Sequence, residues 1–245
     1  MAAMETCCRS AYVGPTDLRD HEPMSTQFLS LLDQLLRRSL RMASQVEDIV
    51  HEACEAVFQP DEKLARRIVS RDSEVDREEV AVEAEVVRLM ALYQPVGVDL
   101  RLLCTVLKVN NDLERIADCA VNIAERSRHQ EVQPLAAQSA DLRQMCPVVQ
   151  QILRNAIQAY SADDAEAARR VVAEDEQVDA LYGQIVRSIV AQAPQSATKM
   201  AGHVDLLSVA KNLERIADHA INIAEDVVFL STGRIVRHQP DDVQP

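Results

Sequence analysis

The sequence predicts an all-α protein made of two tandem three-helix bundles, related by an internal repeat of about 100 residues. Composition is the first observation, since 47% of the 245 residues are hydrophobic while 3% are aromatic and only 5 are Gly, which is typical of helical proteins. The second is that the chain aligns with itself. The third is that turn residues divide each copy into three long segments of helical periodicity.

The repeat is clearest in the last helical segment of each copy. Residues 107–125 and 207–225 agree at thirteen of nineteen positions, and both contain the hexapeptide LERIAD. Upstream, ARRIVSRDSEVD at 65–76 resembles ARRVVAEDEQVD at 168–179. Because both stretches recur at nearly the same offset, the duplicated unit is a whole domain rather than a short motif.

In the first copy, Ser25 or Thr26 could cap the first helix, which ends at a turn at 58–62. Asp61 is the expected cap of the second helix, which ends at the Pro- and Gly-containing turn at 93–97. The third helix runs from that turn to a linker around Pro134. Short turns between long amphipathic helices predict an antiparallel bundle.

The second copy has corresponding breaks at 160–166 and 191–196, and Asp163 with Glu166 is interpreted as a capping box. The predicted organisation is therefore an N-terminal extension at 1–23, expected to be disordered, a first bundle at 24–129, a linker at 130–134, a second bundle at 135–238 and a tail at 239–245.

The third helix of each copy has one apolar and one polar side. At about 100° per residue, the apolar side collects Leu102, Val106, Val109, Leu113, Ala117, Ala120 and Ala124, flanked by Ile116 and Ile123. The opposite side collects Asn111, Glu114, Asp118, Asn122 and Glu125, and in the second copy Lys211, Glu214, Asp218, Asn222 and Glu225. Like charges four residues apart disfavour a helix, so retaining them in both copies indicates a role for the carboxylates.

The second helices carry a matching acidic pair. Asp72 and Asp76 in the first copy correspond to Asp175 and Asp179 in the second. Their neighbours Glu79 and Glu83 are replaced by Tyr182 and Val186, as expected of a merely solvated face. Packed side by side, the second and third helices of each bundle would bring four carboxylates together.

Clustered carboxylates favour hard cations, and iron, manganese, magnesium, calcium and zinc all remain open. The competing interpretation is a solvated face on which Arg115 and Arg215 neutralise neighbouring acids. A carboxylate-bridged di-iron oxidase is disfavoured, because no Glu has a His three residues later.

Charge and segment composition restrict the partners. A net charge of −13 disfavours nucleic acid and anionic membranes. No segment approaches the ~20 apolar residues of a membrane span or has the features of a signal peptide, so the sequence predicts a cytoplasmic protein that contacts membranes only through partners. The six cysteines contain no C-x-x-C pair, and most are expected to be small buried residues, with Cys7 and Cys8 unassigned.

The doubled motifs NNDLERIADCAVNIAE and KNLERIADHAINIAE, with RDSEVD, EDEQVD, QPVGVDLRLL and STGRIVRH, resemble the PhoU family between Ser25 and His238. This resemblance implies a non-catalytic, generally dimeric adaptor that works with the ATPase-driven phosphate ABC transporter and a phosphate-sensing histidine kinase. Such an adaptor holds phosphate-starvation genes silent when phosphate is plentiful.

The resemblance also implies metal sites. The family's Glu/Asp-x-x-x-Asp motifs are associated with iron or zinc clusters, and they map onto Glu114 with Asp118 and onto Glu214 with Asp218. Cys119 stands where the family commonly has a His, whereas His219 keeps that residue, so a metal or a packing role remains open for both. The alternative function is a helical scaffold with solvated acidic faces and no metal.

Overall fold

The structure is a computed structural model that describes residues 26–59, 61–192 and 196–236, apart from the side chains of residues 175, 197 and 198. Its helices are α1 (Thr26–Phe58), α2 (Glu62–Tyr93), α3 (Gly97–Ser127), α4 (Val132–Gln138), α5 (Ala140–Ala162), α6 (Ala165–Val172), α7 (Asp175–Ala191) and α8 (Ala197–Thr232). The predicted all-α architecture with a repeated helical unit is confirmed. The predicted extension at 1–23, the tail at 239–245 and the candidate cap Ser25 lie outside the described residues.

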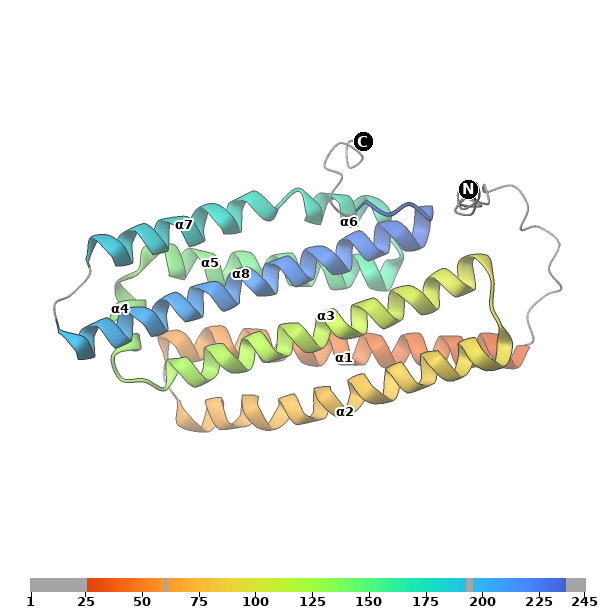
Figure 1. The fold of residues 1–245 in the computed structure, drawn as a ribbon, viewed down its shortest axis with the longest axis horizontal. Helices are drawn as coiled ribbons and strands as arrows, with labels where there is room; N and C mark the ends of the chain where they lie inside the picture. Colours follow the sequence, from red (N-terminus) through yellow and green to blue (C-terminus); the bar gives the residue numbers. More distant parts are fainter. Residues whose placement is uncertain (1–25, 60, 193–195, 237–245) are drawn as a thin grey trace, which may run out of the picture.

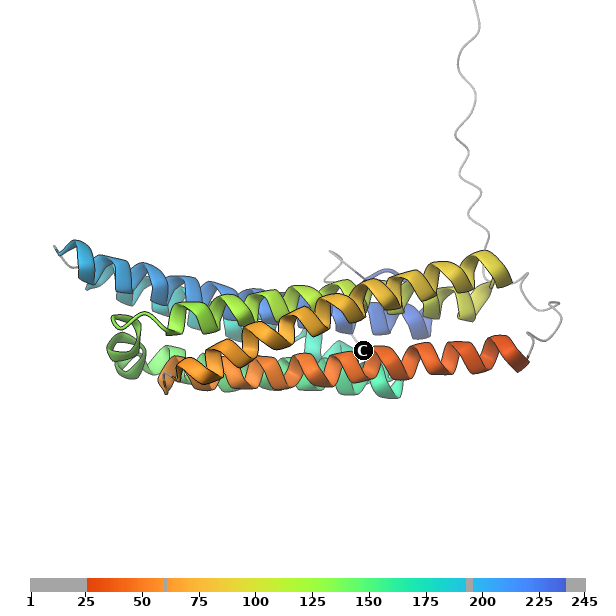
Figure 2. The ribbon, with the colours of Figure 1, turned by 90° about the horizontal axis from the view of Figure 1, so that it is seen from below.

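The two repeats lie side by side along their length. In Figure 1, α3 and α8 form the front of the molecule, with α1 behind α3 and α5 behind α8. Helix α2 forms one long edge, and α6 with α7 forms the other. In Figure 2, which is turned by 90°, α3 lies above α1, so the two helices belong to different layers. Among the described residues, the repeats therefore meet mainly through α3 with α8 and α1 with α5, with smaller contacts from α4 to α1 and α3.

Helices α3 and α8 run antiparallel along a seam with local two-fold symmetry. Arg126 of α3 pairs with Asp205 of α8 at 3.1 Å, while the hydroxyl of Thr105 donates to the carbonyl of Asp226 at 3.5 Å. Positions 105 and 205 are equivalent in the repeat, as are 126 and 226. Exchanging the repeats therefore exchanges these two contacts.

The repeats share one hydrophobic core. A single cluster of buried residues spans both bundles and includes Met42 and Ile116 from the first repeat with Ile152 and Ile216 from the second. The small side chains on the predicted apolar side of α3, including Ala117 and Ala120, are fully buried, which lets α3 approach its neighbours closely. A separate smaller cluster around Phe28 fills the far end of the first bundle.

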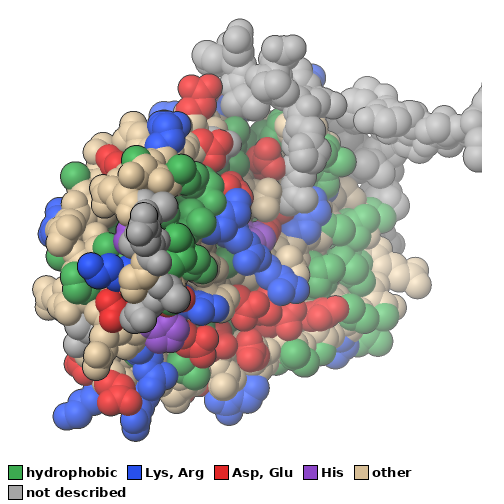
Figure 3. All heavy atoms as spheres, turned by 60° about the vertical axis from the view of Figure 1, so that its left-hand side comes forward, with side chains coloured by type: hydrophobic (Ala, Val, Ile, Leu, Met, Phe, Trp, Pro, Cys, Tyr) green, Lys and Arg blue, Asp and Glu red, His purple; other side chains and the backbone are tan. Residues whose placement is uncertain are grey.

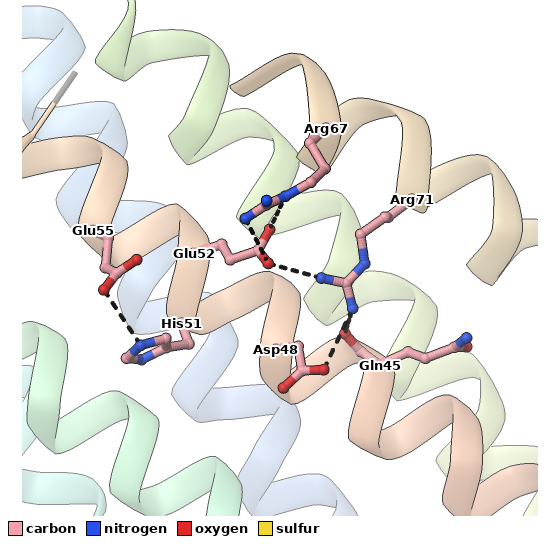
Figure 4. A network of polar contacts seen from close by, with 7 residues as sticks. All are labelled: Gln45, Asp48, His51, Glu52, Glu55, Arg67 and Arg71. Carbon is pink, nitrogen blue, oxygen red and sulfur yellow. Dashed lines mark hydrogen bonds and ion pairs between the residues drawn. The ribbon is translucent and has the colours of Figure 1, made fainter. Parts of the chain in front are cut away.

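Salt bridges on the outer side fasten α2 to α1. Glu52 of α1 accepts from both Arg67 and Arg71 of α2, each at a closest distance of 3.0 Å, and Arg71 also reaches Asp48 (Figure 4). The Glu52 side chain is only 17% exposed, so its two arginines supply the charge that water would otherwise stabilise.

Two helical features differ from the prediction. Helix α4 begins inside the predicted linker 130–134, with Val132 and Ala136 buried and Pro134 in the first turn, where its missing N–H costs no hydrogen bond. The capping box at Asp163 is wrong. Asp164 caps α6 by accepting from the N–H groups of Glu166 and Ala167, while Asp163 ends α5 in the left-handed conformation. The cap at Asp61 is confirmed by its hydrogen bond from Lys63 N.

The second helix of the second repeat is also broken, where one long helix was expected. Helix α6 ends at Val172 and α7 begins at Asp175, after a tight turn in which Glu174 N donates to Val171 O. Residues 174–176 are all acidic, and such a run is better tolerated at a helix N-terminus than in a helix interior. At the position equivalent to Glu174 the first repeat has Arg71, which pairs with Glu52, and α2 continues unbroken.

Candidate functional site

The acidic pairs of α2 and α3 lie against each other and form the first acidic face, defined as Asp72, Asp76, Glu114 and Asp118. Burial and then repulsion from Asp76, Asp118 and Glu114 raise the pKa of Asp72 to about 6. Burial and Asp118 likewise raise the pKa of Glu114. The structure therefore brings together the four carboxylates predicted to cluster in the first repeat.

Glu79 extends this face, although its failure to repeat had argued against it. Burial raises the pKa of the Glu79 carboxyl, with further contributions from Glu83 and Asp76. The side-chain amide of Asn110 on α3 donates to the Glu79 carbonyl at 3.0 Å, which fixes α2 against α3 at this point. The available sequence signal was the spacing of Asp72, Asp76 and Glu79 along one helix face.

Arg115 supplies the positive charge that contacts this face. Its guanidinium lies 3.2 Å from Glu114 and 3.5 Å from Asp118, and its side chain is 49% exposed. The Asp72 carboxylate is stabilised less than these two, because its buried Oδ1 has no hydrogen-bond partner among the described residues. Carboxylates thus outnumber the neutralising groups, and the deficit is largest at Asp72.

The donor chemistry of the first acidic face fits a hard cation, because carboxylate oxygens are the ligands such ions prefer. The side-chain arrangement does not enclose one. Among the described residues, no group of three or more His, Cys, Asp or Glu side chains is placed so that it could hold a metal ion. Figure 3 shows Asp and Glu side chains in a row over the lower part of its view, where α2 and α3 lie. The carboxylates of the first acidic face are therefore not arranged as a closed cage.

The second acidic face, defined as Asp175, Asp179, Glu214 and Asp218, differs from the first. Lys211 lies 2.6 Å from Glu214, whose side chain is 13% exposed, and also lies over the ring of Tyr182 at 5.4 Å. The first repeat has Asn111 and Glu79 at these two positions. Asp179 and Asp218 are exposed, and the side chain of Asp175 lies outside the described residues. Lysine therefore already neutralises one carboxylate of this face.

The four additional candidate ligands do not form one set with these faces. Asn122 is exposed, and Glu125 lines a depression with Asp61 and Glu62, about 10 Å further along α3 than Asp118. Asn222 donates to Asp112 at 3.4 Å within the seam, so its side chain points away from the second acidic face. Glu225 is partly buried on α8.

His219 and Cys119 both lie in the seam between α3 and α8. His219 Nδ1 is 2.8 Å from Asp112 Oδ1. Cys119 is fully buried, and burial raises the pKa of its thiol to about 11, which keeps it protonated near neutral pH. The structure thus gives both residues packing contacts between the repeats.

The seam contains charged pairs that the sequence analysis missed. Lys108 reaches across from α3 to Asp226, which is 2% exposed, at 2.9 Å. Asp112 is also buried, although it precedes the repeated core residue Leu113. The only sequence signal was a polar residue at this position in both copies, Asp112 and Asn212. These pairs hold the repeats in a fixed register.

Comparison with known proteins identifies both repeats. The PhoU domain family matches residues 39–127 and 142–227. Among curated proteins, a phosphate-specific transport system accessory protein PhoU homolog from Xylella fastidiosa (strain Temecula1 / ATCC 700964) is 37% identical over 202 residues, 82% of this chain and 84% of that protein. The PhoU accessory protein of Serratia marcescens is 31% identical over 92% of this chain and 93% of its own length.

Solved structures show the same fold. The crystal structure of PhoU from Pseudomonas aeruginosa superposes with a TM-score of 0.79 at 31% identity, covering 85% of this chain and 100% of that one. The phosphate transport system regulatory protein PhoU from Streptococcus pneumoniae gives a TM-score of 0.78 at 27% identity, covering 86% and 99%. Within the described part of the chain, no helix is long and apolar enough to cross a membrane.

Proposed function

Because this chain belongs to the PhoU family, we propose that it is a cytoplasmic adaptor that negatively regulates phosphate uptake and the phosphate-starvation response. The observation that carries this proposal is the near full-length match to proteins named as accessory proteins of the phosphate-specific transport system. Its partners are the ATPase of the phosphate ABC transporter and a phosphate-sensing histidine kinase. It acts without catalysis, as a homodimer that reaches the membrane only through these partners and does not bind nucleic acid.

The proposal includes metal ions on the acidic faces. Asp72, Asp76, Glu114 and Asp118 would hold them in the first repeat, and Asp175, Asp179, Glu214 and Asp218 in the second. Iron or zinc is the expected metal, with manganese and magnesium as alternatives. A bound cation would supply the positive charge that these carboxylates lack, which is supported by the raised pKa of Asp72 and by its unpartnered oxygen.

Deletion of the gene in its own host tests the regulatory role. All related copies in the genome are deleted, and starvation-gene expression and phosphate uptake are measured in high and low phosphate. Loss of an adaptor removes a restraint rather than a reaction step, so starvation genes should stay on in phosphate-rich medium. Expression and uptake that match wild type under both conditions would contradict the proposal.

A metal-free scaffold is the second candidate, favoured by the open arrangement of the carboxylates. Elemental analysis of protein purified without a metal-affinity tag separates the two. Stoichiometric iron or zinc that survives gel filtration supports the metal-binding adaptor. Metal below stoichiometry, together with a melting temperature unchanged by chelator, supports the scaffold.

A further inference from the structure

Two cysteines from different repeats meet where α1 packs against α5. Cys54 of α1 is 3% exposed and Cys146 of α5 is 4% exposed. The neighbouring Cys54 thiol, together with burial, raises the pKa of the Cys146 thiol well above its ordinary value. This contact lies on the α1–α5 side of the molecule and is separate from both acidic faces.

A depression of about 340 Å³ leads from the surface to this pair. Both cysteines line it, together with Phe58, Arg143 and Pro147. The guanidinium of Arg143 lies 5.2 Å from the centre of the Phe58 ring, so α5 and α1 also meet across the depression. A molecule of the size of hydrogen peroxide can therefore approach the sulfurs although the cysteines are nearly buried.

The rim of the depression is open to solvent. His51 and Glu55 line it and pair with each other at 3.5 Å, and both side chains are 57% exposed. Figure 4 shows that this pair points away from the Glu52 salt bridges that fasten α2. Access to the cysteines is thus separate from the contacts that hold the first bundle together.

We propose that Cys54 and Cys146 form a reversible disulfide that staples the first repeat to the second when a hydroperoxide is present. The sulfur of Cys54 attacks the peroxide oxygen, the O–O bond breaks, and hydroxide leaves and takes up a proton, so Cys54 becomes a sulfenic acid. The sulfur of Cys146 then attacks the Cys54 sulfur, displacing hydroxide, which leaves as water with the Cys146 proton. Two thiols and one hydrogen peroxide become one disulfide and two waters.

The thiol contact assigns the order of these steps. The neighbouring Cys54 thiol and burial raise the pKa of Cys146, so Cys146 holds its proton and is the poorer first attacker. Cys54 is therefore the attacking residue and Cys146 the resolving one. A small-molecule thiol reverses the reaction by exchange, as expected of a disulfide that forms only under oxidant.

The staple would have a mechanical consequence. Among the described residues, the repeats touch mainly through α3 with α8 and through α1 with α5, and the second of these pairs carries both cysteines. A covalent bond between α1 and α5 would restrict the motion of one repeat relative to the other. It would involve no carboxylate of the acidic faces. The proposal therefore holds whether or not the protein binds metal.

The test uses the full chain, reduced and then treated with hydrogen peroxide. Peptide mapping without reductant should recover Cys54 linked to Cys146, and dithiothreitol should release the link. Cys104→Ser, a control at a partly exposed cysteine elsewhere on α3, should keep it. The thermal midpoint of the oxidised protein should rise by roughly 5 °C or more, because the bond closes a long loop.

Single variants test the order of attack. In Cys146→Ser, dimedone should trap a sulfenic acid at Cys54, whereas Cys54→Ser should give no adduct at Cys146. Failure to recover the 54–146 link from peroxide-treated wild type overturns the staple, and this measurement does not depend on whether a variant folds. Trapping at Cys146 rather than at Cys54 overturns the assigned order.

Discussion

His219 of α8 and Asp112 of α3 form a hydrogen bond of 2.8 Å across the seam between the repeats, and Asn222 adds a second contact to the same carboxylate. The Asp112 side chain is 8% exposed and that of His219 is 20% exposed. A histidine that matches a family motif position is thus engaged by a buried carboxylate of the other repeat. This hydrogen bond joins the two repeats.

Asp112→Ala should lower the free energy of unfolding by about 1–3 kcal/mol, because it leaves the polar groups of His219 and Asn222 in the seam without their acceptor. Urea denaturation followed by circular dichroism measures the change. Bound metal per chain should not fall. The control Asp33→Ala removes an exposed ion pair with Arg37 and should cost under about 0.5 kcal/mol. Equal losses for both variants would contradict a special role for the seam.

The double variant Glu114→Ala with Asp118→Ala should remove about half of the bound metal, because it takes two of the four carboxylates from one of two faces. Helical content should stay the same, since neither side chain is part of the core. Elemental analysis and circular dichroism check both parts. Asp33→Ala with Asp48→Ala removes two exposed carboxylates from α1 and should leave metal content unchanged. Unchanged metal in the first double variant would show that this face is not the site.

Lys211→Asn gives the second acidic face the residue that stands at the equivalent position 111 in the first. Glu214 then loses the ammonium group that lies 2.6 Å away, so the face should bind cations more tightly, by roughly tenfold for a gain of about 1.4 kcal/mol. Isothermal titration with zinc or manganese measures the affinity. Lys199→Asn makes the same charge change elsewhere on α8 and should have little effect. No difference between these two variants would mean that Lys211 does not compete with cations.

Asp72→Asn should stabilise the metal-free protein at pH 7.5 by about 1 kcal/mol after allowance for solvent screening, because the ionised carboxylate is partly buried and is also repelled by its neighbours. The pKa of Asp72 in the folded protein is raised to about 6, so between about pH 4 and pH 6 the folded state binds more protons than the unfolded state. The stability of the wild-type protein relative to the variant therefore falls as pH rises through that range. Near pH 3, where Asp72 is protonated in both the folded and the unfolded state, the variant should match wild type. A pH-independent difference in thermal midpoint would argue against this assignment.

Gly202→Ala should destabilise the protein by about 1–3 kcal/mol, because the added Cβ would lie 2.7 Å from Glu131 Cβ and 3.2 Å from its carbonyl oxygen. Gly183→Ala is the matched control on α7, since its Cβ would meet only the flexible end of Arg187 at 3.3 Å. That variant should gain up to about 1 kcal/mol from helix propensity. Urea midpoints that move in the same direction for both variants would contradict the close approach at Gly202.

Local patterns predicted most of the fold. The periodicity of the third helices placed Leu113 and Ile116 in the core, and both are fully buried. The same periodicity placed Glu114 and Asp118 on one face of the third helix. Asp72 and Asp76 were predicted to lie beside them because a matching acidic pair occurs in the second helix of both copies. These successes share a cause, because each depends on residues within one helix or on helices joined by a short turn.

What the sequence did not reveal depends on contacts between distant segments. The pairing of Asp112 with His219 joins residues on opposite repeats, and no helical period relates them. The neighbouring aspartates 163 and 164 compete for one capping role, which the end of α5 decides. The neutralisation of Glu214 by Lys211 needs side-chain geometry that a shared motif cannot give. The same motif thus supports two faces with different electrostatics.

The local two-fold symmetry of the seam bears on the origin of the chain. A half-length ancestor would have exposed the alanine-rich side of its last helix, which a bundle of three helices cannot cover by itself. Because the contacts at 105–226 and 126–205 exchange with the repeats, a second copy of that ancestor could have covered it in the same antiparallel arrangement. Fusion of two such copies would make that association permanent and leave the two halves free to differ, as they now do at Lys211 and at Glu79.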